Sequence, residues 1–212
     1  MTIIAIDGPA GAGKSTVARA LAERLGLAYL DTGAMFRAVA FAAMHRGLDL
    51  EDFDSVGELA ETIDIDVSEL GVFVDGHNAA VEIRTPAVAA AASAIASNSR
   101  VRAELRERQR MWVRRHHGGV VEGRDIGSVV FPHADLKLYL TASPMIRAKR
   151  RVSELGGDVN EIAAAIAERD LADSTRADSP LREADGSVVL DTSGRSIEQV
   201  LQTIETLLRG AS

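Results

Sequence analysis

Cysteine is absent from the 212-residue sequence, aromatic side chains make up only 4% of it, and no long apolar run occurs. The missing cysteine excludes disulfide bonds and thiolate chemistry. No apolar segment approaches the roughly 20 residues that cross a bilayer, and the apolar start at residues 1–6 has no basic region before it. We therefore expect a cytoplasmic chain without a membrane partner.

Lysine is also scarce, because only three of the 24 basic residues are lysine and the others are arginine. A single arginine is therefore a weak signal, and a lysine within a motif is a stronger one. The net charge of −7 argues against a nucleic-acid partner, since neutralising a polyanion takes an excess of basic residues. A small phosphorylated substrate held by a few arginines remains compatible with this charge.

The apolar residues that are present predict one α/β domain. Five short and nearly continuous apolar runs are typical of buried parallel strands, at residues 3–7, 28–30, 120–122, 136–140 and 188–191. Helical patterns occur at 14–25, 34–46, 53–62, 86–96, 100–116, 144–155, 159–172 and 196–208. Thr85 and Ser143 each precede a proline, which predicts an N-cap followed by proline in the first helical position.

Residues 63–83 interrupt this alternation. Apolar and acidic residues alternate at 63–67, as in a half-exposed strand. Asp75-Gly76 is a hairpin signal, and the apolar runs 72–74 and 81–83 lie on either side of it. The segment predicts a small antiparallel sheet inserted into the parallel domain.

A glycine-rich loop between the first strand and the first helix carries the strongest motif, G-x-x-x-x-G-K-[ST]. Its backbone N–H groups and the helix N-terminus would surround phosphate oxygens. Lys14 would reach the β- and γ-phosphates, and the Ser15 hydroxyl would bind Mg²⁺. An ordinary glycine-rich turn is the alternative, but a scarce lysine at the motif position favours nucleotide binding. The residues expected to bind a nucleotide phosphate are Gly8, Pro9, Ala10, Gly11, Ala12, Gly13, Lys14, Ser15 and Thr16.

Two further segments offer arginines for a second phosphate. After the second strand, Asp31 or Thr32 would cap a helix that carries Arg37 one turn later. After the strand at 120–122, Arg124 and Asp125 lie in a glycine-containing loop. This loop follows the carboxyl end of a strand, where α/β proteins bind ligands. Alternatively, Arg37 is a surface arginine, and Arg124 and Asp125 form a weak loop salt bridge.

A third segment contains Arg169, Asp173 and Arg176 at i, i+4 and i+7. These residues share a helix face if the helix continues that far. An ion-pair ladder on a solvated face explains the spacing as well as a binding site does. The spacing by itself does not choose between them.

Together these segments resemble bacterial cytidylate kinases, which are nucleoside monophosphate kinases. The matching pieces are GPAGAGKST, LDTGAMFR, EIRT…AAS…RVR, EGRDIGSVVFP, ERDxxDSTR and LDTSGRSIEQV, in family order. The resemblance implies a P-loop NTPase-type three-layer fold with a five-stranded parallel sheet. It also implies an inserted monophosphate-binding subdomain with a small antiparallel sheet and a short lid. Within a single domain over 1–212, the core is expected at 1–33, 85–145 and 170–212, the insert at about 34–84, and the lid at about 146–169.

The resemblance further implies ATP-dependent phosphorylation of CMP and dCMP, with the 8–16 loop holding ATP and Mg²⁺ as cofactor. We also expect a monomer, although the sequence does not determine the oligomeric state. It implies Lys14, Arg124, Arg147 and Arg151 as catalytic residues and Ser15 as metal ligand. The CMP-binding residues it implies are Thr32, Arg37, Ser93, Arg102, Arg124, Asp125, Arg169, Asp173 and Arg176. Phe36 stands where some members have tyrosine, and the Gly-Lys-Ser-Thr end of the loop replaces Gly-Lys-Gly-Thr. The second difference leaves open whether Ser15 binds the metal.

Other functions make different demands on the sequence. A UMP/CMP, adenylate, shikimate or dephospho-coenzyme A kinase would share the loop. A GTPase switch would need an N-K-x-D motif, which the sequence lacks. The seven arginines at 100–115 would suit nucleic acid, but Val101, Leu105 and Trp112 form an apolar face that favours a packed helix.

Overall fold

The computed structural model describes residues 1–68 and 70–210 of the chain. Backbone contacts divide the chain into two units, which are described separately. Unit 1 comprises Met1–Tyr29 and the segment from His116 onward, and unit 2 comprises Leu30–Arg115. Residues 85–115, expected in the core, group by these contacts with unit 2. The functional division into core, insert at 34–84 and lid at 146–169 stays a prediction.

The five-stranded parallel sheet is confirmed. Its strands are β1 (Thr2–Asp7), β2 (Tyr29–Asp31), β6 (Gly118–Glu122), β7 (Leu136–Thr141) and β8 (Val188–Asp191), in the order β2-β6-β1-β7-β8. Strand β1 runs parallel to β6 and β7 on its two sides, and β7 runs parallel to β8. Because the strands are parallel, β1, β6 and β7 end at one edge, and the loops after them meet there.

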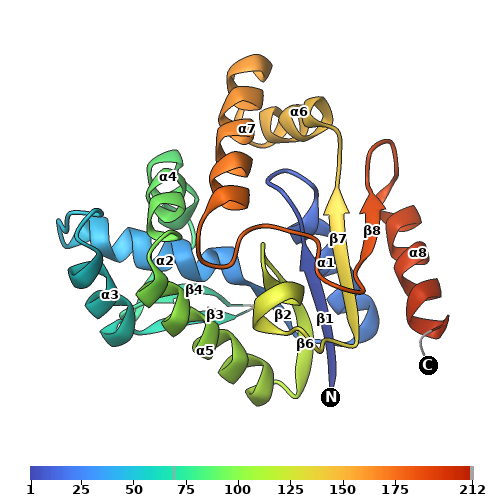
Figure 1. The fold of residues 1–212 in the computed structure, drawn as a ribbon, viewed down its shortest axis with the longest axis horizontal. Coiled ribbons are helices and arrows are strands. Elements are labelled where there is room, and N and C mark those ends of the chain that lie inside the picture. Colours follow the sequence, from blue (N-terminus) through green and yellow to red (C-terminus); the bar gives the residue numbers. More distant parts are fainter. Residues whose placement is uncertain (69, 211–212) are drawn as a thin grey trace. The chain divides into compact units, whose positions relative to one another are not determined.

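Helices of unit 1 bury the apolar side chains of this sheet. Leu21 of α1 (Lys14–Leu25) and Ile204 of α8 (Ile197–Gly210) share a fully buried core with Ile6 and Leu138 of the strands. Helices α6 (Pro144–Leu155) and α7 (Val159–Thr175) lie beyond the arrowhead of β7 in Figure 1. They are therefore at the sheet edge where the phosphate loop also begins.

Unit 2 is built from four α-helices and a small sheet. The helices are α2 (Thr32–His45), α3 (Phe53–Thr62), α4 (Pro86–Ile95) and α5 (Ser99–Arg115). The alanine-rich helices α2 and α4 pack closely, with Ala38, Ala42 and Ala91 buried. Arg100 of α5 forms a bidentate pair with Glu61 of α3 (2.6 and 2.8 Å). Arg108 of α5 donates to carbonyls at the end of α3. Two arginines of the arginine-rich helix α5 therefore hold it against α3.

The predicted antiparallel sheet is confirmed, with one correction. Strands β3 (Ile65–Ser68), β4 (Gly71–Val74) and β5 (His77–Asn78) form it, and Asp75 and Gly76 turn with φ of 49° and 78°. The strand predicted at 81–83 is wrong, because Glu82–Arg84 is a short 3₁₀-helix, η1. The Ile83 N–H bonds the Ala79 carbonyl within its own turn (3.0 Å), so it is not available to pair with β4.

The predicted helix starts are confirmed. The Thr85 hydroxyl accepts from the Val88 N–H, and the Ser143 hydroxyl accepts from the Ile146 N–H. At α2, where two caps were open, the Asp31 carboxylate accepts from the Ala34 N–H (3.0 Å). Among the described helices, none has the length and apolar character that a membrane crossing requires.

Candidate active site

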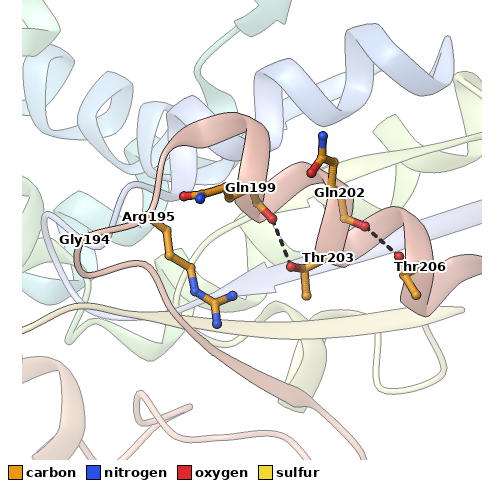
Figure 2. Close-up of a pocket in the computed structure, with 6 residues that line it drawn as sticks. All are labelled: Gly194, Arg195, Gln199, Gln202, Thr203 and Thr206. Carbon is orange, nitrogen blue, oxygen red and sulfur yellow. Dashed lines mark hydrogen bonds between the residues drawn. The ribbon is translucent and has the colours of Figure 1, made fainter.

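A polar hollow of about 520 Å³ lies on unit 1 along α8 (Figure 2). The hydroxyls of Thr203 and Thr206 on its wall donate to carbonyls of their own helix. None of the predicted site residues lines this hollow, so it is not the candidate site. Its lining residues are Gly194, Arg195, Gln199, Gln202, Thr203 and Thr206.

The candidate site is the edge of the sheet where β1 ends and the phosphate loop begins. Gly8 has φ of 145°, and a Cβ there would lie 2.0 Å from the Leu140 carbonyl oxygen, so only glycine fits. A Cβ at Gly11 would lie 3.0 Å from the Arg147 Cβ. Close packing against β7 and α6 therefore explains two glycines of the loop, Gly8 of the motif and Gly11 between the motif positions.

Lys14 begins α1 and is folded back over the loop. It is 6% exposed, and its ammonium donates to the Pro9 carbonyl at 2.8 Å. Burial, and then the positive charge of Arg124, lowers the pKa of Lys14 to about 7. An anionic phosphate beside the ammonium would remove this penalty, so the lysine is prepared for a negatively charged ligand.

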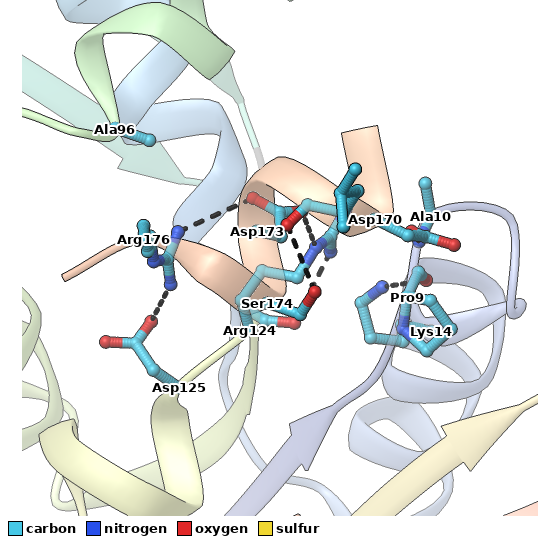
Figure 3. A network of polar contacts seen from close by, with 12 residues as sticks. Pro9, Ala10, Lys14, Ala96, Arg124, Asp125, Asp170, Asp173, Ser174 and Arg176 are labelled. Carbon is cyan, nitrogen blue, oxygen red and sulfur yellow. Dashed lines mark hydrogen bonds and ion pairs between the residues drawn. The ribbon is translucent and has the colours of Figure 1, made fainter. Parts of the chain in front are cut away.

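Arg147 of α6 lies directly on the phosphate loop. Its guanidinium donates to the Ala10 carbonyl at 3.1 Å and pairs with the Asp170 carboxylate. Figure 3 shows Ala10 of the loop beside Asp170. The other Asp170 oxygen accepts from the Ala10 N–H at 3.2 Å. Helices α6 and α7 are thereby tied to the loop by an arginine and a carboxylate.

Arg151, one helical turn further along α6, has a different environment. It pairs with Glu154 on the exposed side of the helix, and its side chain is 38% exposed. Arg150 instead reaches the loop region, where it donates to the Thr192 carbonyl (2.9 Å) and hydroxyl (3.0 Å). The Thr192 hydroxyl donates in turn to the Ala12 carbonyl of the loop (3.1 Å). Arg150 also donates to the Gly11 carbonyl at 3.5 Å, so Arg147 and Arg150 both contact the loop.

A buried network joins the loop after β6 to the end of α7 (Figure 3). The Arg124 guanidinium donates to one Asp173 oxygen at 2.8 Å, and Arg176 pairs with the other at 3.5 Å. Arg176 also pairs with Asp125 at 3.6 Å. All four side chains are at most 18% exposed. Arg124 and Asp125 thus each pair with the 173–176 segment, and the ladder is not on a solvated face.

The charge state of Asp173 follows from its neighbours. Burial opposes ionisation, but the charge and hydrogen bond of Arg124, together with the charges of Arg169 and Arg176, lower the pKa of Asp173 below its usual value. Arg169 contributes to the same field, since its charge also acts on Lys14. Unit 1 therefore gathers Lys14, Arg124, Arg169 and Arg176 within one electrostatic environment.

The predicted residues of unit 2 lie on α2, α4 and α5. Arg37 pairs with the Asp31 carboxylate at 2.8 Å, and Thr32 is buried in the first turn of α2. Arg102 is 4% exposed, donates to the Ala96 carbonyl, and has its guanidinium 5.5 Å from the Phe36 ring centroid. Phe36 thus offers its face to an arginine. Ser93, the remaining predicted residue of unit 2, is half-buried on α4.

A sequence model described as cytidylate kinase matches residues 4–209. The chain belongs to the cytidylate kinase family.

Individual relatives of the family are similar along nearly the whole chain. The cytidylate kinase of Streptomyces avermitilis is 45% identical over 212 residues, covering 97% of this chain and 92% of that protein. The bifunctional pantoate ligase/cytidylate kinase of Prochlorococcus marinus is 47% identical over 220 residues and covers 98% of this chain. The match covers 44% of that protein, so this chain spans less than half the length of such relatives.

Solved structures support the fold of this family member. A sugar kinase from Janibacter superposes with a TM-score of 0.53 at 18% identity, covering 99% of this chain and 95% of that one. The shikimate kinase of Acinetobacter baumannii superposes with a TM-score of 0.50 at 16% identity, covering 99% and 94%. At these identities the likeness concerns the fold alone.

Two buried carboxyl groups at the candidate site, Asp7 and Glu122, were not predicted from the sequence. Asp7 ends β1 directly before the loop, is 3% exposed, and accepts from backbone N–H groups of Ile126 and Gly127. Burial raises the pKa of Asp7 to about 6, although these two hydrogen bonds oppose the shift. Glu122 ends β6, is also buried, and accepts from the Tyr29 hydroxyl at 2.5 Å. Their place at strand ends beside the motif was the available signal.

The candidate metal ligand Ser15 is exposed in the first turn of α1. Among the residues that the structure describes, no three histidine, aspartate or glutamate side chains gather into a metal site. One hydroxyl next to a phosphate loop suits Mg²⁺, which keeps several waters and is held largely by substrate phosphates. The residues therefore fit a metal that arrives with ATP.

Proposed function

We propose that this chain transfers the γ-phosphoryl group of ATP to CMP and dCMP, forming ADP and CDP or dCDP. One observation carries the proposal beyond family membership. Within unit 1, the phosphate loop with Lys14 is accompanied by the buried Arg124–Asp173–Arg176–Asp125 network. This arrangement supplies a donor site and the charges that a second phosphorylated ligand requires.

On the donor side, we assign residues 8–16 to the phosphates of ATP. The backbone N–H groups of the loop and the N-terminus of α1 favour phosphate oxygens. The Lys14 ammonium exchanges its bond to the Pro9 carbonyl for the β- and γ-phosphates. Arg147, already against the loop, adds a bidentate donor. When bound, Mg²⁺ would be held by Ser15 and would neutralise charge on the transferring phosphates.

On the acceptor side, unit 1 contributes Arg124, Asp125, Arg169, Asp173 and Arg176 as CMP contacts. The resemblance implies Thr32, Arg37, Ser93 and Arg102 as further CMP contacts. An acceptor phosphate is already anionic at neutral pH, so it needs no general base. The arginines neutralise and orient it for attack on the γ-phosphorus, which is the main requirement of phosphoryl transfer.

Asp125 supports the choice of cytosine as base. Its carboxylate accepts hydrogen bonds, so it can accept from the cytosine 4-amino group, whereas uracil presents a carbonyl oxygen at that position. Because the side chain is 9% exposed, a mismatch there leaves two acceptors facing each other without water. Such mismatches discriminate strongly.

A steady-state panel of CMP, dCMP, UMP and AMP with ATP and Mg²⁺, coupled to ADP detection, tests the function. CMP and dCMP should have the highest kcat/KM. A higher kcat/KM for UMP or AMP would assign a different small kinase, such as a UMP/CMP kinase. If none of the four monophosphates is phosphorylated, the proposal is refuted.

The variant Asp125→Ala tests the base assignment. The preference for CMP over UMP should narrow roughly 10- to 100-fold, from the 1–3 kcal/mol of one buried polar contact. Asp135→Asn serves as control, because Asp135 lies near the amino end of β1, where its carboxylate accepts from the Ile3 N–H. An unchanged CMP-to-UMP ratio in Asp125→Ala removes Asp125 from base selection.

A further inference from the structure

Asp7 is the residue directly before the phosphate loop, and both of its carboxylate oxygens are committed. Oδ1 accepts from the Ile126 N–H at 2.8 Å, and Oδ2 accepts from the Gly127 N–H at 2.7 Å. The side chain is 3% exposed. It is therefore a buried bridge between the end of β1 and the segment that follows Arg124 and Asp125.

The position of this bridge matters because the pairing of β1 with β6 stops just before it, whereas on the other side of β1 Asp7 still pairs with Tyr139 of β7. Strand β1 pairs with β6 as far as Ile6 opposite Glu122, and the Gly123 N–H still bonds the Ile6 carbonyl at 2.9 Å. Beyond Gly123 the chain leaves the ladder and enters the single π-helical turn Ile126–Val130. Where the hydrogen bonds between β1 and β6 end, the Asp7 side chain continues the contact between the two segments.

The chemistry of the bridge demands a carboxylate. Two backbone N–H groups need two acceptors at a fixed spacing, and an asparagine has only one acceptor oxygen. Its amide N–H₂ would face the second backbone donor. A buried carboxylate costs solvation free energy, so an apolar residue would serve a purely packed strand end better.

We propose that Asp7 is a positioning residue that sets the distance between the phosphate loop and the Arg124–Asp125 segment, and so aligns the acceptor phosphate with the γ-phosphoryl group. The proposal rests on the proposed function. The Asp7 side chain holds the backbone of the segment that follows Arg124 and Asp125. Asp7 also directly precedes Gly8, the first residue of the phosphate loop. The loop proposed to bind ATP and the segment proposed to bind CMP are thereby both fixed to the end of β1.

Alignment affects turnover more than binding. Each substrate keeps its own ligands when the bridge is weakened, but the two reacting groups meet less often in line. A misplacement of about 1 Å costs on the order of 100-fold in rate. Asp7→Asn should therefore lower kcat about 10- to 100-fold, with KM for ATP and CMP changing by less than about threefold, well below one decade.

Gly127→Ala perturbs the same bridge from its other side and keeps every polar group. The added Cβ would lie 3.3 Å from the Asp7 Oδ2 and 3.2 Å from the Lys137 Cδ, so the segment must shift by a few tenths of an ångström. We expect a smaller loss of kcat with unchanged KM. In the double variant the losses should not add, because both changes act on one contact.

Asp135→Asn is the matched control, since it also removes a carboxylate that accepts a backbone N–H, here of Ile3 in the same strand. It should keep wild-type kcat and KM. Circular dichroism and thermal unfolding of all variants check the fold, and if Asp7→Asn is unfolded, Gly127→Ala decides.

If the wild type is active on CMP, any one of three results would overturn the proposal. The first is a wild-type kcat in folded Asp7→Asn or folded Gly127→Ala. KM could rise as much as kcat falls, which would make Asp7 part of a binding site. The Mg²⁺ concentration for half-maximal rate could rise in Asp7→Asn, which would make Asp7 a metal ligand through water. A wild type inactive on CMP would instead refute the proposed function.

Discussion

Replacing Asp173 by alanine tests whether the buried charge network stabilises unit 1. Asp173 lies between two arginines, with oxygens 2.8 Å from the Arg124 Nε and 3.5 Å from the Arg176 Nη1. Its side chain is 9% exposed. Removing it leaves two guanidinium groups in a poorly solvated place, and Asp125 is the carboxylate that still pairs with Arg176.

The size of the effect follows from burial. Removing one partner of a buried ion pair costs about 3–5 kcal/mol, because the remaining charge is uncompensated. For a chain of this length, each kcal/mol lowers the melting temperature by about 2–4 °C. We therefore expect Asp173→Ala to melt roughly 6–20 °C below the wild type.

Urea and thermal unfolding, followed by circular dichroism, measure this loss. The control is Glu198→Ala, which breaks the pair of Glu198 with Arg24, where the side chains are 54% and 35% exposed. Water solvates both partners there, so the control should melt close to the wild type. If Asp173→Ala loses no more stability than the control, the network is not a stabilising element and the reasoning fails.

The dependence on pH gives a second test of the same network. The folded-state pKa of Asp173 is lowered, chiefly by Arg124 against the opposing effect of burial. The stabilisation is therefore complete above the unfolded value of about 3.9 and is lost as pH falls through the folded pKa. The gap in stability between wild type and Asp173→Ala should stay constant from pH 8 to about 5 and shrink in acid.

Further predictions concern the phosphate loop. Lys14→Ala should keep the fold by circular dichroism and lose at least about 100-fold in kcat, since it removes a charge at the transferring group; near-wild-type turnover would refute its role. With the pKa of free Lys14 at about 7, ATP binding should take up a proton above that pH, and affinity measured by calorimetry should fall by up to about tenfold per pH unit. Lys14→Ala should abolish that dependence. Arg147→Ala should lower kcat more than Arg151→Ala, because Arg147 contacts the loop and Arg151 pairs with exposed Glu154; equal losses would contradict this.

Much of the fold could be predicted because its signals are local. Apolar runs of strand length identified all five parallel strands, and Thr85 and Ser143 marked two helix starts by capping. The strand predicted at 81–83 is wrong because a short apolar run does not by itself distinguish a strand from a helical turn. Residues two apart in a strand point to the same face, but Val81 is 78% exposed and Ile83 is 1% exposed. The hydrogen bond of Ile83 to Ala79 closes a turn there instead.

The candidate site divides in the same way. The loop at 8–16 is contiguous, so glycines, lysine and hydroxyls at fixed spacing predict a phosphate site without knowledge of the rest. The arginines offered less, because 21 residues of that type carry the same charge and differ only in their partners. The family resemblance implied both Arg147 and Arg151 as catalytic residues, but in the structure Arg147 contacts the loop and Arg151 pairs with Glu154.

The sequence by itself determined the order of strands and helices, the phosphate loop and the family, since each rests on residues close together in the chain. The tertiary structure decided which charges meet. Arg124 pairs with Asp173, which lies 49 residues further along the chain, and Asp7 accepts from the N–H of Gly127, which lies 120 residues further along. Pairing and pKa depend on distance and burial in space, and parallel strands bring distant segments to one edge of a sheet.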